Sequence, residues 1–246
     1  MMVLLRSTLY MLLQIPITIF FCLGGCLLIV VPLKWRYYFV TRWSMTMLFL
    51  LKHICGLDCE VIGKENIPKE PGVVLCKHQS AFETIYLQKI FPFQTWVIKR
   101  ELLLVPFFGW GLGLLHPIAI DRKNKECKPK LIADGIKKIA SGIWVVIFPE
   151  GTRVKVGSTG RFTRSGSELA IAANAWVVPV ALNAGIFWPR NSFLKYPGTI
   201  TVEIGKAFKP SELDPNISGP ALTDYVKNWI EATTVKLENK ALLNNK

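Results

Sequence analysis

The chain has 246 residues, of which 51% are hydrophobic and only 19% are charged. So apolar a chain folds around a core, which excludes the disordered and collagen-like classes, and its charge is too sparse for a coiled coil. The 30 Lys and Arg residues exceed the 17 Asp and Glu residues and give a formal net charge of +13. This charge favours an anionic partner, whether nucleic acid, a lipid surface or a phosphorylated substrate.

The apolar residues concentrate near the N-terminus. Residues 7–33 carry no formal charge, and about 20 apolar helical residues are enough to cross a bilayer. Pro16 and the pair Gly24-Gly25 interrupt this run, so both a kinked helix and half of a re-entrant hairpin fit it. Residues 34–38 follow, with cations and aromatic rings that favour the lipid headgroup region.

A second apolar stretch, residues 43–57, is too short to span a bilayer alone and suits its interface. We therefore predict a helical membrane anchor over residues 1–56 and a second domain over residues 57–246. The six cysteines form no C-x2-C pair, and two of them lie in the apolar segment. This pattern favours reduced thiols and a main body that faces the cytoplasm.

From residue 58 onward, short apolar runs alternate with helical patterns, which is typical of an α/β domain with a largely parallel sheet. The predicted strands are 72–76, 95–98, 114–120, 143–148, 175–182 and 199–204. The predicted helices are 81–90, 129–141, 167–173 and 222–239. No Ser-rich or Gly-rich linker divides this body, so we expect one domain behind the anchor.

His78 directly follows a predicted strand, at the sheet edge where open α/β folds bind ligands. Ser80 and Glu83 have the spacing of a capping box, which turns the carboxylate back over the start of the helix. In that position Glu83 accepts a hydrogen bond from one imidazole nitrogen and leaves the other nitrogen as a base. The same residues also fit a simple helix cap beside a loop histidine, and the two interpretations are compatible.

Three further blocks follow predicted strands or form one. Lys99-Arg100-Glu101 comes after one strand, and Phe148-Pro-Glu-Gly-Thr-Arg153 comes after the central strand. Gly151 permits a tight turn that leaves Arg153 beside the same sheet edge as His78. Pro179 lies within the last block, residues 177–182.

Taken together and in this order, the four blocks resemble the glycerolipid acyltransferase family, and within it the 1-acyl-sn-glycerol-3-phosphate acyltransferases. The resemblance covers residues 72–185 and implies that His78 is the catalytic base and Glu83 its partner carboxylate. The commonest form of the first block ends in Asp, whereas this chain has Glu83. The residues that match the positions associated with holding the glycerol phosphate are Lys99, Arg100, Glu150, Gly151, Thr152 and Arg153.

The chemistry suits these residue types. An alcohol attacks an acyl thioester once a base removes its proton, which neutral imidazole does near pH 7. The chain has no Gly-x-Ser-x-Gly elbow, so we expect direct transfer without an acyl-enzyme. Arg153, with Arg161 and Arg164, offers planar cations for a phosphate, unless the three belong to a solvated basic loop.

The resemblance implies a membrane enzyme that moves an acyl chain from coenzyme A or acyl-carrier protein to 1-acyl-sn-glycerol 3-phosphate (lysophosphatidate), forming phosphatidate. Two alternatives stay open: another acceptor, such as glycerol 3-phosphate or another lyso-lipid, and a membrane-anchored lipid-binding protein without turnover. We expect no cofactor, no metal site and no nucleic-acid partner. The expected location is the inner membrane of a bacterium, with the catalytic domain facing the cytoplasm.

Two groups of residues have open roles. One is a basic run made up of Arg122, Lys123, Lys125, Lys128 and Lys130. It suits contact with lipid headgroups, coenzyme A phosphates or an acidic carrier protein, and it equally suits the solvated start of a helix. Four aromatic residues are candidates either for an acyl groove or for the core: Trp96, Phe107, Phe108 and Trp110.

Overall fold

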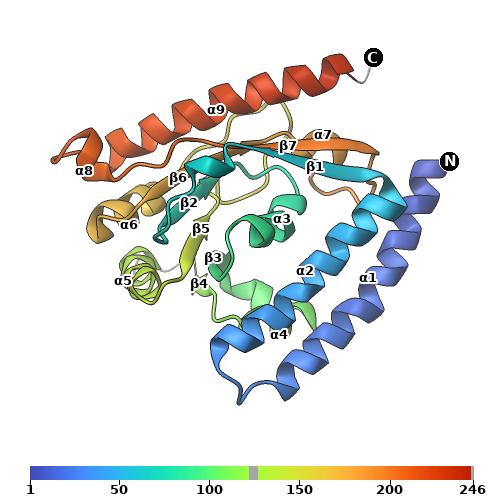
Figure 1. Ribbon diagram of the computed structural model, residues 1–246. Helices are drawn as coiled ribbons and strands as arrows, with labels where there is room; N and C mark the ends of the chain where they lie inside the picture. The colour runs from blue at the N-terminus through green and yellow to red at the C-terminus, as the bar shows by residue number, and fades with distance from the viewer. Residues whose placement is uncertain (122–126, 245–246) are drawn as a thin grey trace.

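The computed structural model describes residues 1–121 and 127–244, and its described part is built around one sheet (Figure 1). The strands are β1 (Leu57–Ile62), β2 (Val73–Cys76), β3 (Gln94–Lys99), β4 (Ile118–Ile120), β5 (Trp144–Ile147), β6 (Val177–Leu182) and β7 (Gly198–Ile204). Their order across the sheet is β1-β7-β6-β2-β5-β3-β4. Neighbouring strands run parallel except β6 and β7, which run antiparallel.

Helices cover both faces of the sheet. They are α1 (Met2–Leu27), α2 (Leu33–Cys55), α3 (Phe82–Ile90), α4 (Phe108–Gly113), α5 (Cys127–Ala140), α6 (Ser165–Ala173), α7 (Ala184–Phe187), α8 (Pro210–Leu213) and α9 (Gly219–Asn244), with 3-10 turns at Lys64–Asn66 and Arg100–Leu104. Side chains alternate between the faces of a strand. Val74 and Val146 therefore join a core with α2 and α3, whereas Val73 and Val145 join one with α5, α6 and α9.

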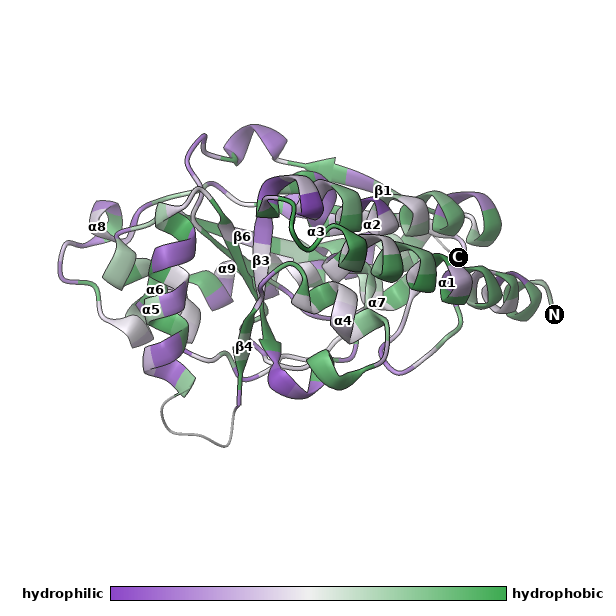
Figure 2. Ribbon diagram, turned by 90° about the horizontal axis from the view of Figure 1, so that it is seen from below, coloured by the Kyte–Doolittle hydropathy of each residue, from purple (hydrophilic) through white to green (hydrophobic). Residues whose placement is uncertain are grey.

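The N-terminal helices α1 and α2 lie side by side at one end of the molecule, opposite α5, α6 and α8 (Figures 1 and 2). Helix α1 is continuous through Pro16. It is long and apolar enough to cross a membrane, and it alone is so among the described helices. Helix α2 is different in kind, because its Met47, Leu51 and Cys55 are fully buried in the core shared with the sheet.

The prediction of an α/β fold with a mostly parallel sheet behind an apolar helix is confirmed, with local differences. Most of the apolar stretch 43–57 belongs to a longer helix, Leu33–Cys55, and its last residue, Leu57, begins β1. The predicted strand 114–120 shortens to Ile118–Ile120, because His116 adopts a φ of 51°, which interrupts an extended run. β1 and the antiparallel direction of β7 were not predicted from the apolar pattern.

Candidate active site

His78 and Glu83 form a direct pair at the carboxyl end of β2. His78 lies in the β2–α3 loop (residues 77–81), and Glu83 lies in the first turn of α3. The His78 Nδ1 and Glu83 Oε1 atoms are 2.8 Å apart. A carboxylate only accepts hydrogen bonds, so Nδ1 carries the proton and Nε2 keeps a free lone pair.

Glu83 does two jobs with one oxygen. Its Oε1 also accepts the backbone N–H groups of Gln79 at 2.6 Å and of Ser80 at 2.7 Å, while the Ser80 hydroxyl accepts the N–H of Phe82 at 3.2 Å. The carboxylate is 1% exposed. Glu83 therefore folds back over the start of the helix and orients His78 at the same time, as predicted. Ser80 is not the N-cap, however, because α3 begins at Phe82 after Ala81, which makes no side-chain cap hydrogen bond.

The second element of the site is the β5–α6 loop (residues 148–164). Phe148 stacks on the imidazole of His78, with ring centroids 4.1 Å apart. Glu150 Oε2 accepts the backbone N–H of His78 at 3.1 Å, and the N–H of Val154 donates to the His78 carbonyl at 2.8 Å. Gly151 makes the intervening turn with a φ of 67°, which glycine adopts without a steric penalty.

Glu150 is buried against a cation. The Lys77 ammonium, which is inaccessible to solvent, lies 3.1 Å from Glu150 Oε1 and 2.7 Å from Glu231 Oε1. Burial raises the pKa of Glu150 to about 7, although Lys77 opposes this shift. Glu150 therefore supports His78 from behind and does not line the cavity described next.

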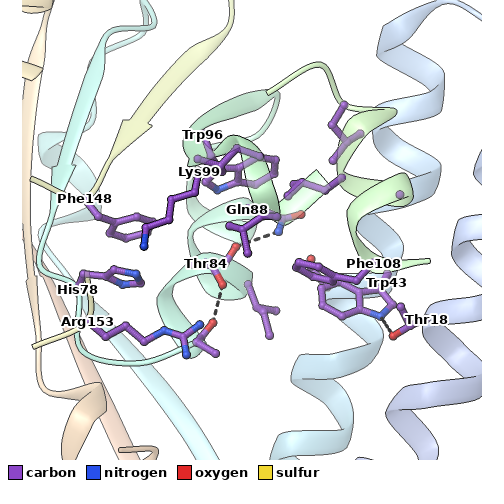
Figure 3. A pocket seen from close by; sticks show the side chains of 18 of the residues that line it. Thr18, Trp43, His78, Thr84, Gln88, Trp96, Lys99, Phe108, Phe148 and Arg153 are labelled. Carbon is purple, nitrogen blue, oxygen red and sulfur yellow. Dashed lines mark hydrogen bonds between the residues drawn. The ribbon is translucent and has the colours of Figure 1, made fainter. Parts of the chain in front are cut away.

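A cavity of about 520 Å³ opens in front of His78. Lys99, Gly151, Thr152 and Arg153 line it together with His78. Figure 3 shows His78, Lys99 and Arg153 on the side of the sheet, facing Trp43, Thr18 and Phe108 across the cavity. Two cations thus flank the imidazole on the sheet side of a space that continues between the helices.

The far walls of this cavity come from α1, α2, α3 and α4, and they are mainly apolar. Lining residues from these helices include Phe21, Val40, Ile85, Phe108 and Leu112. Of the four aromatic candidates, Trp96, Phe107 and Phe108 line the cavity, while Trp110 does not belong to its lining. An apolar space lined at one side by an imidazole and two cations fits an amphipathic ligand with an anionic end.

The other sequence candidates lie elsewhere. Arg100 lines a separate hollow together with Lys130, and Arg161 and Arg164 are exposed outside the main cavity. Lys128 pairs with Glu168 at 2.6 Å. The remaining basic residues of that run, Arg122, Lys123 and Lys125, lie outside the described residues. Within residues 1–121 and 127–244 no three His, Cys, Asp or Glu side chains gather as a metal site.

Sequence reasoning missed Arg190 and Asn191, which line the cavity after α7. It also missed the buried ammonium of Lys77 directly before His78. Nothing local in the sequence marks Arg190, because it stands outside the four blocks. Lys77 carried a usable signal, since a lysine at the end of a fully apolar strand needs a buried acidic partner.

Comparisons with known proteins identify the family of this chain. The acyltransferase family model matches residues 58–183. A 1-acyl-sn-glycerol-3-phosphate acyltransferase of Pseudomonas aeruginosa is 43% identical over 210 residues, which cover 85% of this chain and 81% of that protein. The human 1-acyl-sn-glycerol-3-phosphate acyltransferase alpha is 31% identical over 74% of this chain and 65% of its own.

A solved structure shares the fold. The crystal structure of the 1-acyl-sn-glycerophosphate acyltransferase PlsC from Thermotoga maritima matches with a TM-score of 0.78 and 20% identity, covering 96% of this chain and 95% of that one. The family model matches about half of the chain, and the Pseudomonas relative is similar over most of it. The chain therefore belongs to the acyltransferase family that its four sequence blocks predict.

Proposed function

We propose that this enzyme acylates lysophosphatidate to phosphatidate by direct transfer, with His78 as the general base. The observation that carries the proposal is the 2.8 Å contact between His78 Nδ1 and Glu83 Oε1, with His78 lining the cavity. Glu83 holds the imidazole with Nε2 free to take the acceptor's hydroxyl proton as that oxygen attacks the thioester carbonyl. The carboxylate then stabilises the imidazolium, which returns its proton to the departing thiolate.

The cations beside His78 suit the charged ends of both substrates. Arg153 and Lys99 line the cavity next to the imidazole, where a guanidinium makes a forked pair with a phosphate. When the acceptor phosphate binds Arg153, the acyl chain of the acceptor lies along the apolar walls toward α1 and α2. This division supports lysophosphatidate over an acceptor without a phosphate.

The membrane supplies the acceptor. Helix α1 exposes a broad apolar surface, and both α1 and α2 contribute to the cavity wall. A lyso-lipid thus reaches His78 from the bilayer through the helical end of the molecule. We place the enzyme on the inner membrane of a bacterium, with the acyl thioester of coenzyme A or acyl-carrier protein arriving from the cytoplasm.

Purified full-length protein in mixed micelles tests this function. With lysophosphatidate and an acyl-coenzyme A or acyl-carrier-protein donor, we expect phosphatidate and free thiol in equal amounts. Glycerol 3-phosphate and lysophosphatidylcholine as competing acceptors identify the preferred one, and turnover of either above that of lysophosphatidate would refute the assignment.

The matched variant is His78→Ala, which removes a partly exposed loop side chain and leaves the core intact. We expect turnover to fall at least a thousandfold while the melting temperature stays close to that of the wild type. Ordinary turnover in this folded variant would remove His78 from the mechanism.

A further inference from the structure

Helix α9 lies outside the matched residues 58–183, yet it contacts the residues on both sides of His78. Glu231 Oε1 is 2.7 Å from Nζ of Lys77, the residue before His78. Glu238 Oε1 accepts a hydrogen bond of 2.6 Å from Nε2 of Gln79, the residue after His78. Glu231 and Glu238 are seven residues apart, close to two helical turns, so both carboxylates lie on one face of α9.

The same carboxylates extend to the loop that carries Arg153. Glu238 Oε2 accepts the backbone N–H of Gly157 at 3.0 Å. The Lys77 ammonium, paired with Glu231, also bonds to the Ser158 carbonyl at 3.4 Å and to Glu150 at 3.1 Å. One face of α9 therefore connects the β2–α3 loop to the β5–α6 loop.

The side chains on both sides of His78, and one of their partners on α9, are buried and fixed in orientation: Lys77 is 0% exposed, Gln79 1% and Glu238 4%. The Glu231 side chain is 13% exposed, and Gly157 and Ser158 lie at the surface. The Gln79 amide cannot turn over without loss, because its Oε1 accepts the N–H of Gly185 at 3.2 Å while its Nε2 donates to Glu238. Because the side chains of Lys77 and Gln79 are buried, each of these hydrogen bonds restricts the position of the backbone beside His78.

The packing of α9 against the body does not require the two carboxylate contacts. Leu222, Val226 and Ile230 already bury the apolar face of α9 in the core. A buried ion pair is often no more stabilising than apolar residues of similar size, whereas its directional bonds define one geometry. The apolar contacts thus already hold α9 against the body, and the carboxylates add hydrogen bonds that define the geometry of the two loops.

We propose that Glu231 and Glu238 are positioning residues, which hold the loops of His78 and Arg153 in the mutual arrangement that the transfer requires. The inference rests on the proposed role of His78 as the base. It assigns to α9 a function in catalysis, although neither carboxylate touches the cavity.

Glu238→Gln is the first test. The new amide places an NH₂ group against a donor, either Gln79 Nε2 or the Gly157 N–H, so one bond is lost and the two loops shift. Small misplacements of reacting groups slow chemistry strongly. We therefore expect kcat to fall at least tenfold when it is measured at saturating substrate and at a temperature well below the melting temperature. Asp224→Asn, an exposed carboxylate on the same helix, is the matched control and stays within twofold of the wild type.

The second test is an exchange of the two side chains. In the double variant Gln79→Glu/Glu238→Gln, the carboxylate at position 79 accepts the Gly185 N–H and an N–H of the new amide at position 238. The oxygen of that amide accepts the Gly157 N–H. The exchange restores every bond and keeps the net charge, while Gln79→Glu alone opposes two carboxylates. We expect the double variant to exceed both single variants in kcat by at least threefold.

Of these variants, Glu231→Gln is expected to disturb folding least, because Lys77 keeps Glu150 as its ion-pair partner. It is expected to lower kcat at least threefold. An unchanged kcat in Glu238→Gln and Glu231→Gln would overturn the inference, and so would an exchange variant no better than its more active parent. In either case His78→Ala still reports independently on the base. An active His78→Ala variant would overturn the base and this inference together.

Discussion

At the scale of single residues, the site depends on Glu83 Oε1, which accepts bonds from one imidazole and two backbone N–H groups. We predict that Glu83→Gln lowers kcat more than tenfold, because the amide oxygen still accepts the N–H groups but no negative charge stabilises imidazolium. Glu83→Ala loses the acceptor as well and leaves buried N–H groups unpaired, which costs about 1–3 kcal/mol each. Parallel measurements of kcat and unfolding separate the two effects, and an active Glu83→Gln would reduce the residue to a cap.

Arg153 is the residue whose role is tested through the substrate. If it holds the acceptor phosphate, Arg153→Ala loses a charge-assisted contact worth about 1.5–3 kcal/mol, which raises the acceptor KM roughly 10–150-fold. The donor KM stays nearly constant, and Arg153→Lys recovers only part of the loss because an ammonium makes no forked pair.

The control for Arg153 is an acceptor without a phosphate. We expect the wild type to use monoacylglycerol poorly and Arg153→Ala to leave that activity almost unchanged. An equal loss with both acceptors would mean that Arg153 shapes the Gly151 turn and does not bind the phosphate.

At the scale of elements, the exposed side of α1 carries a stripe of large apolar residues at helical spacing. Leu5, Leu12, Phe20, Leu23 and Leu27 are each more than half exposed, and a soluble surface rarely gathers so many. We predict that the stripe enters lipid. Full-length protein then resists extraction by alkaline carbonate and requires detergent.

Two substitutions within this stripe, Leu5→Gln and Leu12→Gln together, test the lipid contact without disturbing the core. Each residue points away from the protein, so we expect unchanged folding in detergent and at least tenfold weaker binding to vesicles, since each removes a large apolar side chain from the lipid contact. Unaltered vesicle binding would assign attachment to the basic surface, which salt screens.

Removing residues 1–56 is a poorer test of attachment. Helix α2 buries Met47, Leu51 and Cys55 in the shared core, and α1 is tied to the body where the Ser7 hydroxyl accepts the N–H of Lys195 at 2.9 Å. A chain starting at Leu57 would therefore expose its core. The division of the chain at residues 56 and 57 stays a prediction.

At the scale of the whole molecule, the sequence was informative where chemistry is local. His78 and Glu83 lie within six residues of each other, and the turn at Gly151 follows directly from its block, so their arrangement was predictable. The pairing of Lys77 with Glu231 joins residues 154 positions apart, and a cavity wall from α1 depends on packing between distant helices. Such contacts leave no periodic signal in the chain.

The last prediction concerns the charge buried where these distant segments meet. Burial raises the pKa of Glu150 from its ordinary value of 4.5 to about 7, with Lys77 lowering it and Glu231 raising it. Unfolded protein releases this proton near pH 4.5 and folded protein only near pH 7. The stabilising contribution of Glu150 is therefore complete below pH 4.5 and is lost as the pH rises toward 7.

Two variants isolate this contribution in unfolding measurements between pH 4.5 and 8. Glu150→Gln cannot titrate, so its unfolding free energy declines less across the window than that of the wild type. Glu231→Gln removes a charge that adds to burial in raising the Glu150 pKa, so the decline becomes smaller and ends at a lower pH. Because other groups titrate equally in all three proteins, the differences between the curves report on this cluster. Curves of identical slope would show that Glu150 ionises in the folded enzyme as it does in the unfolded chain.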